Sequence, residues 1–321
     1  MLIDGLQCGF FDREIFEDLR RGGFICVTPT LGFWEGTLES LDAIGRWRDL
    51  ARECSDVMLL AGSVADILEA RDSNRIAILP GFQNTNCLEG RIRNVELFAD
   101  LGVRVMQLTY NNQNELGASC YEESDSGLAR FGKEVIREMN RAGVLVDLSH
   151  VGEKTTLDAI KWSQKPVAVT HANAASIFPH KRNKGDDVLR ALRDSGGIIG
   201  CATYRNITPA AACDSAEAWC EMVARTADIA GIDHVGIGTD TTHHSSQAYL
   251  DWMRMGRWSR TVNYGAGSAA NSGPAPEPQW LTRPSDLSKV HAALKRVGFN
   301  AEESAKITSG NWLRVYRETF G

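Results

Sequence analysis

Two histidines each stand where an apolar, strand-like run ends, and their spacing suits metal or proton chemistry. His150 follows the run Val144–Ser149. His171 follows Val167–Thr170, after a helix-length segment. Consecutive strands of a parallel sheet end at the same edge, so the two imidazoles would meet at one point. Neutral imidazole is the commonest protein ligand for zinc and related ions. The alternative is that each histidine only caps its strand by hydrogen bonding, but a pair in register favours metal binding or catalysis.

Further polar side chains stand at the ends of other strand-like runs. They are Gln83, Tyr110, Tyr204 and Asp240. If the strands form a barrel, these side chains share one face with the two imidazoles. Such a set suggests metal-assisted hydrolysis or a related proton transfer. Asp240 could ligate the metal or act as the base that handles the attacking water. Its alternative role is an Asx turn or a helix cap.

The segment after the sixth strand-like run carries a guanidinium group that suits a carboxylated substrate. Arg182 there can hold a carboxylate in bidentate fashion, and we assign Asn183 and Tyr204 to substrate binding beside it. The alternative for Arg182 is an ion pair at the surface. Cys8 could be a thiolate ligand beside a cation, or a buried apolar filler.

The elements that must position these residues alternate between short β-branched runs and amphipathic helices. The expected strands are Leu2–Asp4, Phe24–Thr28, Ile76–Gly81, Val103–Thr109, Val144–Ser149, Val167–Thr170, Ile198–Ala202 and Val235–Thr239. The expected helices between them are Arg13–Arg20, Leu38–Ala51, Gly90–Asp100, Gly127–Ala142, Lys154–Trp162, Val188–Ser195 and Ala216–Ala230. This count predicts an α/β fold, a (β/α)8 TIM barrel. A doubly wound open sheet is the alternative, but no Gly-x-Gly-x-x-Gly turn follows the first run.

The alternation stops after the eighth predicted strand. Residues 257–284 are rich in Gly, Ser, Ala, Asn and Pro, which predicts a long loop. A loop at this end of a barrel strand favours a lid over the site. Two helices, Ser285–Arg296 and Ala301–Thr319, complete the chain. We therefore expect a single domain over residues 1–321.

The composition excludes several classes of partner. The 321 residues carry a formal net charge of −6, and no Lys/Arg cluster suggests nucleic-acid binding. No apolar run approaches the length of a membrane-spanning helix, and the N-terminal residues do not form a signal peptide. Eight scattered cysteines without Cys-x-x-Cys pairs indicate reduced thiols. We expect a cytoplasmic protein that acts on a small-molecule substrate.

Several ordered motifs resemble the renal (membrane) dipeptidase family of metallopeptidases, within the amidohydrolase-like barrels. The motifs are Gly143-Val-Leu-Val-Asp-Leu-Ser-His150, Thr170-His171-Ala-Asn-Ala, Arg182-Asn183, His234-Val-Gly-Ile-Gly-Thr-Asp240 and Gly310-Asn311-Trp-Leu-Arg314-Val. The resemblance covers nearly the whole chain. It implies a (β/α)8 barrel with a two-zinc site that cleaves dipeptides, often as a homodimer.

The metal positions of this chain depart from that family's pattern. Leu6 and Cys8 stand where the family's opening Asp-Gly-His-x-Asp motif has its ligating His and second Asp. Gln83 corresponds to the bridging glutamate, Tyr110 to a substrate-contacting histidine and Thr242 to a second aspartate after the eighth strand. His150 and His171 correspond to the histidines that bind the family's other zinc, and Arg182 corresponds to its carboxylate-binding arginine. Asp240 is also kept. These losses disfavour a second metal ion.

Three interpretations stay open. In the first, which we favour, one Zn²⁺ held by His150 and His171, with Gln83 or Cys8, assists hydrolysis of an amide-type bond. Asp240 would be the general base or acid, and Tyr110 would stabilise the oxyanion. The second is a lyase, isomerase or decarboxylase that uses the same pocket on a small carboxylate. The third is a catalytically inactive binding protein with the same fold.

Overall fold

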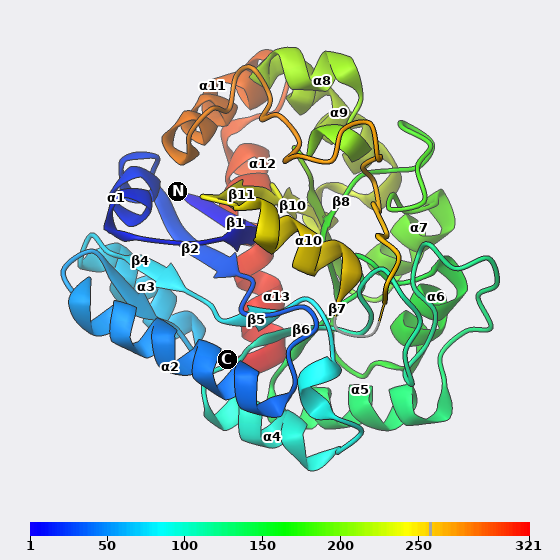
Figure 1. The fold of residues 1–321 in the computed structure, drawn as a ribbon. Helices are drawn as coiled ribbons and strands as arrows, with labels where there is room; N and C mark the ends of the chain where they lie inside the picture. The colour runs from blue at the N-terminus through cyan, green and yellow to red at the C-terminus, as the bar shows by residue number, and fades with distance from the viewer. Residues whose placement is uncertain (257–258) are drawn as a thin grey trace.

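Parallel strands form a closed ring with helices outside it (Figure 1). The computed structural model describes residues 1–256 and 259–321. Around the ring the strands follow the order β1, β2, β4 continued by β5, then β6 to β10, and β10 pairs with β1. The ring closes between β2 and β5 through the bridge from Thr30 to Gly81. A single α/β domain with this arrangement confirms the predicted (β/α)8 barrel.

The bounds of the elements are as follows. The strands are β1 (Leu2–Gly9), β2 (Phe24–Pro29), β3 (Met58–Leu60), β4 (Ile76–Ile78), β5 (Gly81–Phe82), β6 (Val105–Gln107), β7 (Leu145–Asp147), β8 (Ala168–Ala172), β9 (Ile198–Cys201), β10 (Val235–Ile237) and β11 (Thr241–His243). The helices are α1 (Arg13–Arg21), α2 (Thr37–Glu53), α3 (Val64–Asp72), α4 (Arg93–Asp100), α5 (Arg130–Ala142), α6 (Glu153–Trp162), α7 (Asp186–Asp194), α8 (Ala210–Asp214), α9 (Ala216–Ala230), α10 (Gln247–Met255), α11 (Lys289–Arg296), α12 (Ala301–Ala305) and α13 (Asn311–Phe320).

Each of the eight predicted strands overlaps a strand of the ring. β1 is longer than predicted and β8 runs through His171, so this histidine lies within its strand. The prediction missed β3, α3 and α10. β3 has three residues and pairs with β4 at the edge of the sheet, outside the closed ring, so its apolar run is too short to signal a strand.

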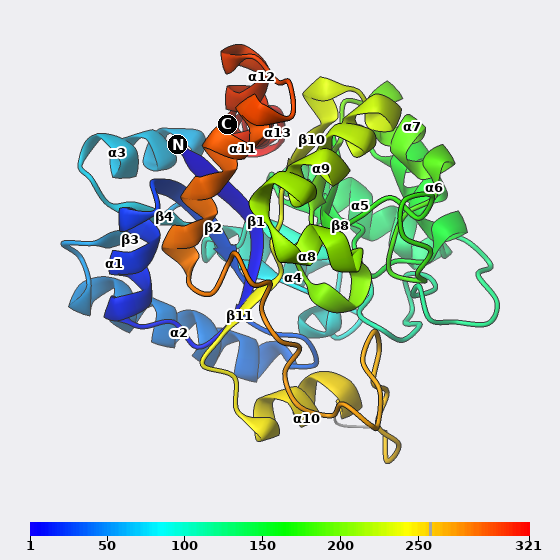
Figure 2. The ribbon, with the colours of Figure 1, turned by 90° about the horizontal axis from the view of Figure 1, so that it is seen from above.

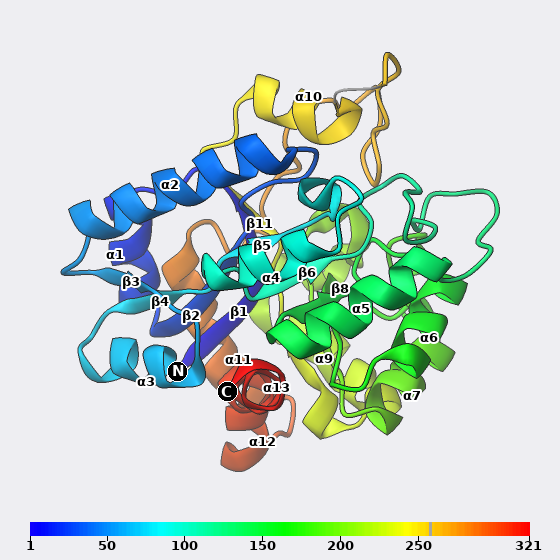
Figure 3. The same ribbon diagram turned by 90° about the horizontal axis from the view of Figure 1, so that it is seen from below.

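An apolar plug closes the end of the barrel where the strands begin. Trp312 of α13 is fully buried and donates a hydrogen bond from its indole nitrogen to the carbonyl oxygen of Ile237 at 2.9 Å. A Cβ atom at Gly5 or Gly236 would lie 2.4 or 2.6 Å from this indole. Only glycine leaves room there. Figures 2 and 3 show α12 and α13 at one end of the barrel and α10 at the other.

The opposite end, where the strands finish, lies beneath α10 and the segment 259–284. Trp34 donates a hydrogen bond to the carbonyl oxygen of Met253, and the Trp252 indole donates one to Glu35, so α10 is fixed to the loop after β2. Of the predicted lid, residues 257 and 258 lie outside the described residues. Within the described residues, no helix combines the length and apolarity needed to cross a membrane.

Candidate active site

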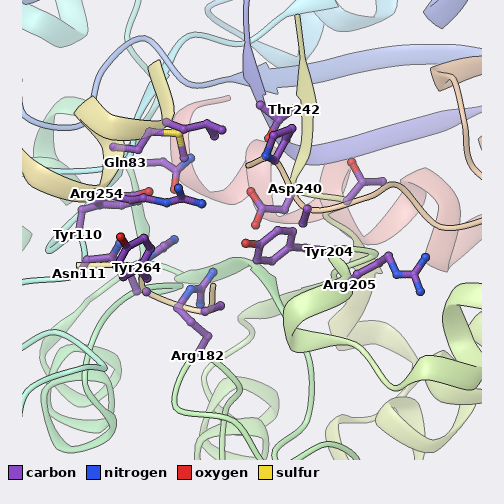
Figure 4. Close-up of a pocket in the computed structure, with 18 of the residues that line it drawn as sticks. Gln83, Tyr110, Asn111, Arg182, Tyr204, Arg205, Asp240, Thr242, Arg254 and Tyr264 are labelled. Carbon is purple, nitrogen blue, oxygen red and sulfur yellow. Dashed lines mark hydrogen bonds between the residues drawn. The ribbon is translucent and has the colours of Figure 1, made fainter. Parts of the chain in front are cut away.

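A cavity of about 930 Å³, open to solvent, lies at the end of the barrel where the strands finish. Its wall includes strand-end residues together with residues from α10 and the segment 259–284 (Figure 4). The predicted site residues that line it are Gln83, Tyr110, His150, Arg182, Tyr204 and Asp240. The structure therefore brings most of the predicted site to one place.

The two predicted imidazole ligands meet at the wall of this cavity. The Nε2 atoms of His150 and His171 are 3.1 Å apart. On the far side of each ring, His150 Nδ1 lies 2.7 Å from Asn111 Oδ1, and His171 Nδ1 lies 2.7 Å from Thr170 Oγ1. His150 lines the cavity, whereas His171 is fully buried behind it. Both rings are thus held at Nδ1 and turned toward each other at Nε2.

Both imidazoles are neutral at neutral pH. Burial, reinforced by the positive charges of Arg182 and Lys184, holds the pKa of His150 and of His171 well below the ordinary value of 6.5. A neutral imidazole keeps the lone pair that a metal ligand needs.

Arg182 is a buried cation that faces the cavity without a carboxylate partner. Its side chain is 2% exposed and donates hydrogen bonds to the carbonyl oxygens of Ser149 and His171. Among the described residues, no Asp or Glu forms an ion pair with it. Burying an uncompensated charge is costly, so an anionic group of a ligand would satisfy it.

Cys8 and Gln83 bind each other instead of joining the imidazoles. The Gln83 amide nitrogen donates to Cys8 Sγ at 3.0 Å and to Thr30 Oγ1 at 2.8 Å. Burial and the charge of Asp240 raise the pKa of the Cys8 thiol well above its usual range, so it stays protonated. Leu6 is buried in an apolar cluster beside Cys8, with Phe33, Trp34 and Tyr110. Apolar packing and hydrogen bonds therefore engage the three residues that depart from the family's pattern, which are Leu6, Cys8 and Gln83.

The imidazole pair has the chemistry of metal ligands. Two neutral imidazoles present Nε2 atoms at one point, which is the arrangement of two ligands of a single ion. Within residues 1–256 and 259–321, no three His, Cys, Asp or Glu side chains come together as a metal-binding group. Cys8 thus stands apart from the imidazole pair. The buried Oε1 of Gln83 accepts no hydrogen bond from the described residues and remains a free oxygen donor at the cavity.

Asp240 is a carboxylate of the cavity whose pKa is raised to near neutral pH. Burial, together with the charge of Asp4, raises its pKa to about 7 against the opposing effect of Arg182. Its backbone has φ of 61°, in the left-handed region, and its N–H donates to the carbonyl oxygen of Leu6 at 3.1 Å. Asp tolerates this conformation better than most residues, and such strain is common at functional sites.

The two predicted tyrosines line the cavity, whereas Asn183 does not belong to its described lining. The ring of Tyr110 lies 4.4 Å from that of His150, between centroids, and burial raises the phenol pKa well above 10. Burial also raises the pKa of Tyr204 to about 12, so both phenols stay protonated. The Asn183 amide instead donates to the carbonyl oxygens of Phe178 and Ile207 and fixes the loop after β8.

The cavity also contains residues that the sequence analysis missed. Asn111 contacts His150, and Arg254 and Glu277 come from α10 and the segment 259–284. Glu277 lines the cavity but stays exposed to solvent, and its carboxylate lies near Asp240 and the Thr242 N–H. No strand precedes Glu277, so its position along the chain gave no signal. Figure 4 shows Arg182 and Asp240 converging on the cavity, with the guanidinium of Arg205 directed away.

The chain is similar in sequence to dipeptidases. It is 30% identical over 287 residues to dipeptidase tcpJ of Claviceps purpurea. The match covers 88% of this chain and 59% of that protein. It is 32% identical over 206 residues to dipeptidase verJ of Clonostachys rogersoniana. That match covers 64% of this chain and 52% of that protein. The chain therefore spans about half to three fifths of the length of these curated relatives.

Similarity to a solved structure extends over the whole chain. The crystal structure of an amidohydrolase from Pseudomonas aeruginosa has a TM-score of 0.94 and 33% identity, and the match covers 100% of this chain and 97% of that one. The structure of dipeptidase AC, a metallopeptidase of family M19, has a TM-score of 0.80 at 18% identity over 100% of this chain and 98% of that one, which supports the fold alone. The family model for membrane dipeptidase (peptidase family M19) matches residues 25–250. The chain belongs to the membrane dipeptidase family, M19.

Proposed function

We propose that the protein hydrolyses an amide-type C–N bond of a small carboxylated substrate with the help of one divalent metal ion, most simply zinc. The observation that carries this proposal is the pair of neutral imidazoles, His150 and His171, whose Nε2 atoms meet at the cavity wall. An ion held there would supply a Lewis acid and a water of lowered pKa. The free amide oxygen of Gln83 is the further protein donor at hand.

The other groups of the cavity have roles that follow from their protonation states. Asp240, with a pKa of about 7, can accept a proton from the attacking water and return it to the leaving amine. Arg182 clamps the substrate carboxylate, because it lacks a protein counter-ion. Tyr110 stays protonated and can donate a hydrogen bond to the developing oxyanion. Tyr204 lines the substrate space, and Asn183 supports it from behind.

Ordinary dipeptidase activity is not part of this proposal. The resemblance aligns the family's second metal position with Leu6, which lies in an apolar cluster, and with Cys8 and Gln83, which hydrogen-bond to each other. A binuclear mechanism needs both ions to clamp and activate one water. We therefore expect one substrate bond that a single ion can activate, such as that of an N-acyl amino acid, a lactam or an imine.

A second function, metal-free proton transfer by a lyase or isomerase, is favoured by one observation. The described residues offer no third His, Cys, Asp or Glu beside the two imidazoles. Asp240 and Tyr110 could then move protons on a carboxylate held by Arg182. A non-catalytic binding protein would need only Arg182 and the cavity.

The proposal also includes a reducing, cytoplasmic environment and a homodimer. All eight cysteines are free thiols, and seven of them are buried. Leu38 and Leu41 are 77% and 42% exposed on the same face of α2, which offers an apolar surface to a second copy. Light scattering of the purified chain would measure its mass in solution.

Metal content and turnover test the proposed hydrolase together. We expect about one zinc per chain by elemental analysis in the wild type, and none in His150→Ala/His171→Ala. The matched control is His291→Ala, which changes an exposed histidine outside the cavity and should keep its metal. A panel of N-acyl amino acids, dipeptides and lactams would then be assayed, and Arg182→Lys should raise KM roughly 10-fold or more because bidentate binding is lost.

Two results would overturn the proposal. Two bound ions per chain would restore a binuclear dipeptidase site. Turnover by the metal-free protein that survives in the double histidine variant would favour the lyase or isomerase instead.

A further inference from the structure

A buried carboxylate, Asp147, lies behind the imidazole pair and has no role in the proposed chemistry. It is the last residue of β7 and is 1% exposed. Its Oδ1 accepts hydrogen bonds from the N–H and hydroxyl of Ser149 and from the N–H of Thr170, at 3.0, 2.6 and 3.0 Å. Its Oδ2 accepts the Thr170 hydroxyl at 2.8 Å. The carboxylate thus fixes Thr170, the residue directly before His171.

The hydrogen bonds of Thr170 determine where His171 carries its proton. A threonine hydroxyl has one hydrogen and two lone pairs. Thr170 Oγ1 lies 2.8 Å from Asp147 Oδ2 and 3.1 Å from Ser149 Oγ, whose own hydrogen goes to Asp147 Oδ1. With its hydrogen donated to the nearer Asp147 Oδ2, the Thr170 oxygen can only accept from His171 Nδ1, 2.7 Å away. His171 therefore has its proton on Nδ1 and a lone pair on Nε2. The backbone N–H of His171 also donates to Ser149 Oγ, so the backbone of His171 is held by the same hydrogen-bond network.

His150 is held in the same tautomer by a different residue. Its Nδ1 lies 2.7 Å from the amide oxygen of Asn111, which accepts hydrogen bonds and cannot donate them. Nε2 of His150 therefore also carries a lone pair. Two lone pairs then face each other across 3.1 Å. In the rival arrangements one ring donates an Nε2–H to the other. A donating His171 requires the Thr170 hydroxyl to turn away from Asp147, and a donating His150 requires the Asn111 amide to turn its nitrogen toward His150 Nδ1.

We propose that Asp147 is a positioning residue, which acts through Thr170 to hold His171 in the Nδ1–H tautomer and so leaves two converging Nε2 lone pairs for one cation. The inference rests on the proposed metal role of this site and deepens it. Carboxylates and hydroxyls behind metal-binding histidines commonly set tautomer and ring orientation in this way. Here the carboxylate reaches the ring through an intervening hydroxyl.

The barrel contains an internal control for this arrangement. Asp4 of β1 is equally buried and accepts the N–H and hydroxyl of Thr239, at 2.8 and 2.6 Å, and the N–H of Leu6. Thr239 precedes Asp240, whereas Thr170 precedes His171. The two networks share the same chemistry on two strand pairs, β1 with β10 and β7 with β8, but only one ends on an imidazole. Asp4→Asn therefore makes the same change without an effect on His171.

Nitrogen-15 NMR of histidine-labelled, metal-free protein tests the proposal directly, because the two tautomers have different ring nitrogen shifts. We expect His150 and His171 to be Nδ1–H in the wild type. In Asp147→Asn the new amide N–H would donate to Thr170, whose hydroxyl would then donate to His171 Nδ1, so His171 should switch to Nε2–H. Thr170→Val should release the tautomer, Thr170→Ser should keep it, and Asp4→Asn should leave it unchanged.

Zinc titration by calorimetry gives a second readout. We expect the Kd to rise roughly 10- to 100-fold in Asp147→Asn and Thr170→Val, and to stay within about twofold in Thr170→Ser and Asp4→Asn. If Asp147→Asn does not fold, the two Thr170 variants carry the test. An Nε2–H signal from His171 in the wild type, or an unchanged tautomer in Thr170→Val, would overturn the inference. If the tautomers are as expected but no variant binds zinc, the positioning role stands and the metal proposal fails.

Discussion

Two features of Asp240 lower the stability of the fold, as is common for catalytic residues. Its backbone is in the left-handed region, and its carboxyl is enclosed so that burial raises the pKa to about 7. Arg182 limits this rise without forming a direct ion pair with Asp240 among the described contacts. A base with a pKa near the working pH can both take and return a proton, so the same feature that costs stability supports catalysis.

We predict that Asp240→Asn lowers kcat/KM by about 100-fold or more, because general acid–base catalysis contributes roughly that much. In the wild type, kcat/KM should rise with pH to a plateau above about 7, as Asp240 becomes a carboxylate. The measurement is the pH profile of both proteins on the best substrate of the panel. A variant that keeps the wild-type acid limb would assign the limb to another group, and Glu277→Gln is the variant to compare first.

The same substitution should stabilise the fold at alkaline pH. The folded pKa of Asp240 lies above the ordinary value of 3.8, so the stability that this group contributes is present below 3.8 and is lost as pH rises through about 7. Asn is neutral at every pH. We expect Asp240→Asn to melt several degrees above the wild type at pH 8, and the difference to shrink toward zero near pH 4. A lower Tm than the wild type at pH 8 would show that the carboxylate is stabilised in the fold.

At the scale of elements, two of the strands that carry the site approach β8 so closely that only glycine fits at the points of contact. A Cβ atom at Gly238, just after β10, would lie 1.7 Å from the carbonyl oxygen of Thr170. One at Gly200 in β9 would lie 2.1 Å from the same atom. Both glycines therefore allow β8, β9 and β10 to converge inside the ring, with His171 within β8 and Asp240 after β10.

Substitution of two glycines by alanine should have opposite effects. Gly238→Ala should destabilise the fold by about 1–3 kcal/mol or more, since backbone must move to make room. Gly45→Ala, within α2, meets nothing within 4 Å and should stabilise by about 0.5–1 kcal/mol because alanine favours the helix. Urea unfolding of both variants measures the difference. A stabilised Gly238→Ala would show that the strands are less closely spaced than described.

Arg254 makes several of the contacts between helix α10 and the segment 259–284. Arg254 donates hydrogen bonds to the carbonyl oxygens of Ser272 and Gly273, and its guanidinium lies 5.5 Å from the ring centre of Tyr264. Tyr264 lines the cavity, as do Pro274 to Glu277 of the same segment. The lid role that the sequence suggests for this segment stays a prediction.

We predict that Arg254→Ala accelerates thermolysin cleavage within residues 259–284 and raises KM, while the barrel melts at nearly the same temperature. The matched control is Arg260→Ala, because Arg260 is an exposed arginine of the same segment. Cleavage and KM unchanged from the wild type would show that the segment is held by other contacts.

At the scale of the whole molecule, one end of the barrel provides rigidity and the other provides chemistry. The Trp312 plug and its surrounding glycines fix the end where the strands begin. The cavity at the other end encloses buried charge that only a ligand or an ion would satisfy. Binding at this end should therefore be felt in the stability of the entire fold, because the barrel unfolds as a unit.

We predict that zinc raises the Tm of the metal-free protein by a few degrees. A ligand at 100 times its Kd stabilises by about 2.7 kcal/mol, and one kcal/mol corresponds to roughly 1–2 °C in a domain of 321 residues. A chelator should reverse the shift, and His150→Ala/His171→Ala should abolish it. An equal shift in the double variant would mean that the ion binds elsewhere in the chain.

The sequence by itself determined the barrel and the imidazole pair. Hydrophobic periodicity is a local property, so the strands of the ring and most of the helices could be read from runs of a few residues. The strand ends then placed His150, Arg182 and Asp240 at one face, because parallel strands of a barrel finish together. Among the elements that were missed, β3 has three residues and α10 lies outside the alternation, whereas α3 follows the missed β3.

Only the tertiary structure determined which side chains contact one another and form hydrogen bonds. Gln83 and Cys8 come from different strands, and their hydrogen bond follows from packing that no local pattern encodes. Asn183 faces backbone carbonyl groups, although its place beside Arg182 suggested substrate binding. Glu277 lies near Asp240 only because a long segment folds back over the cavity. Residue type and spacing predict where a backbone goes, whereas hydrogen-bond partners depend on distances between segments far apart in the chain.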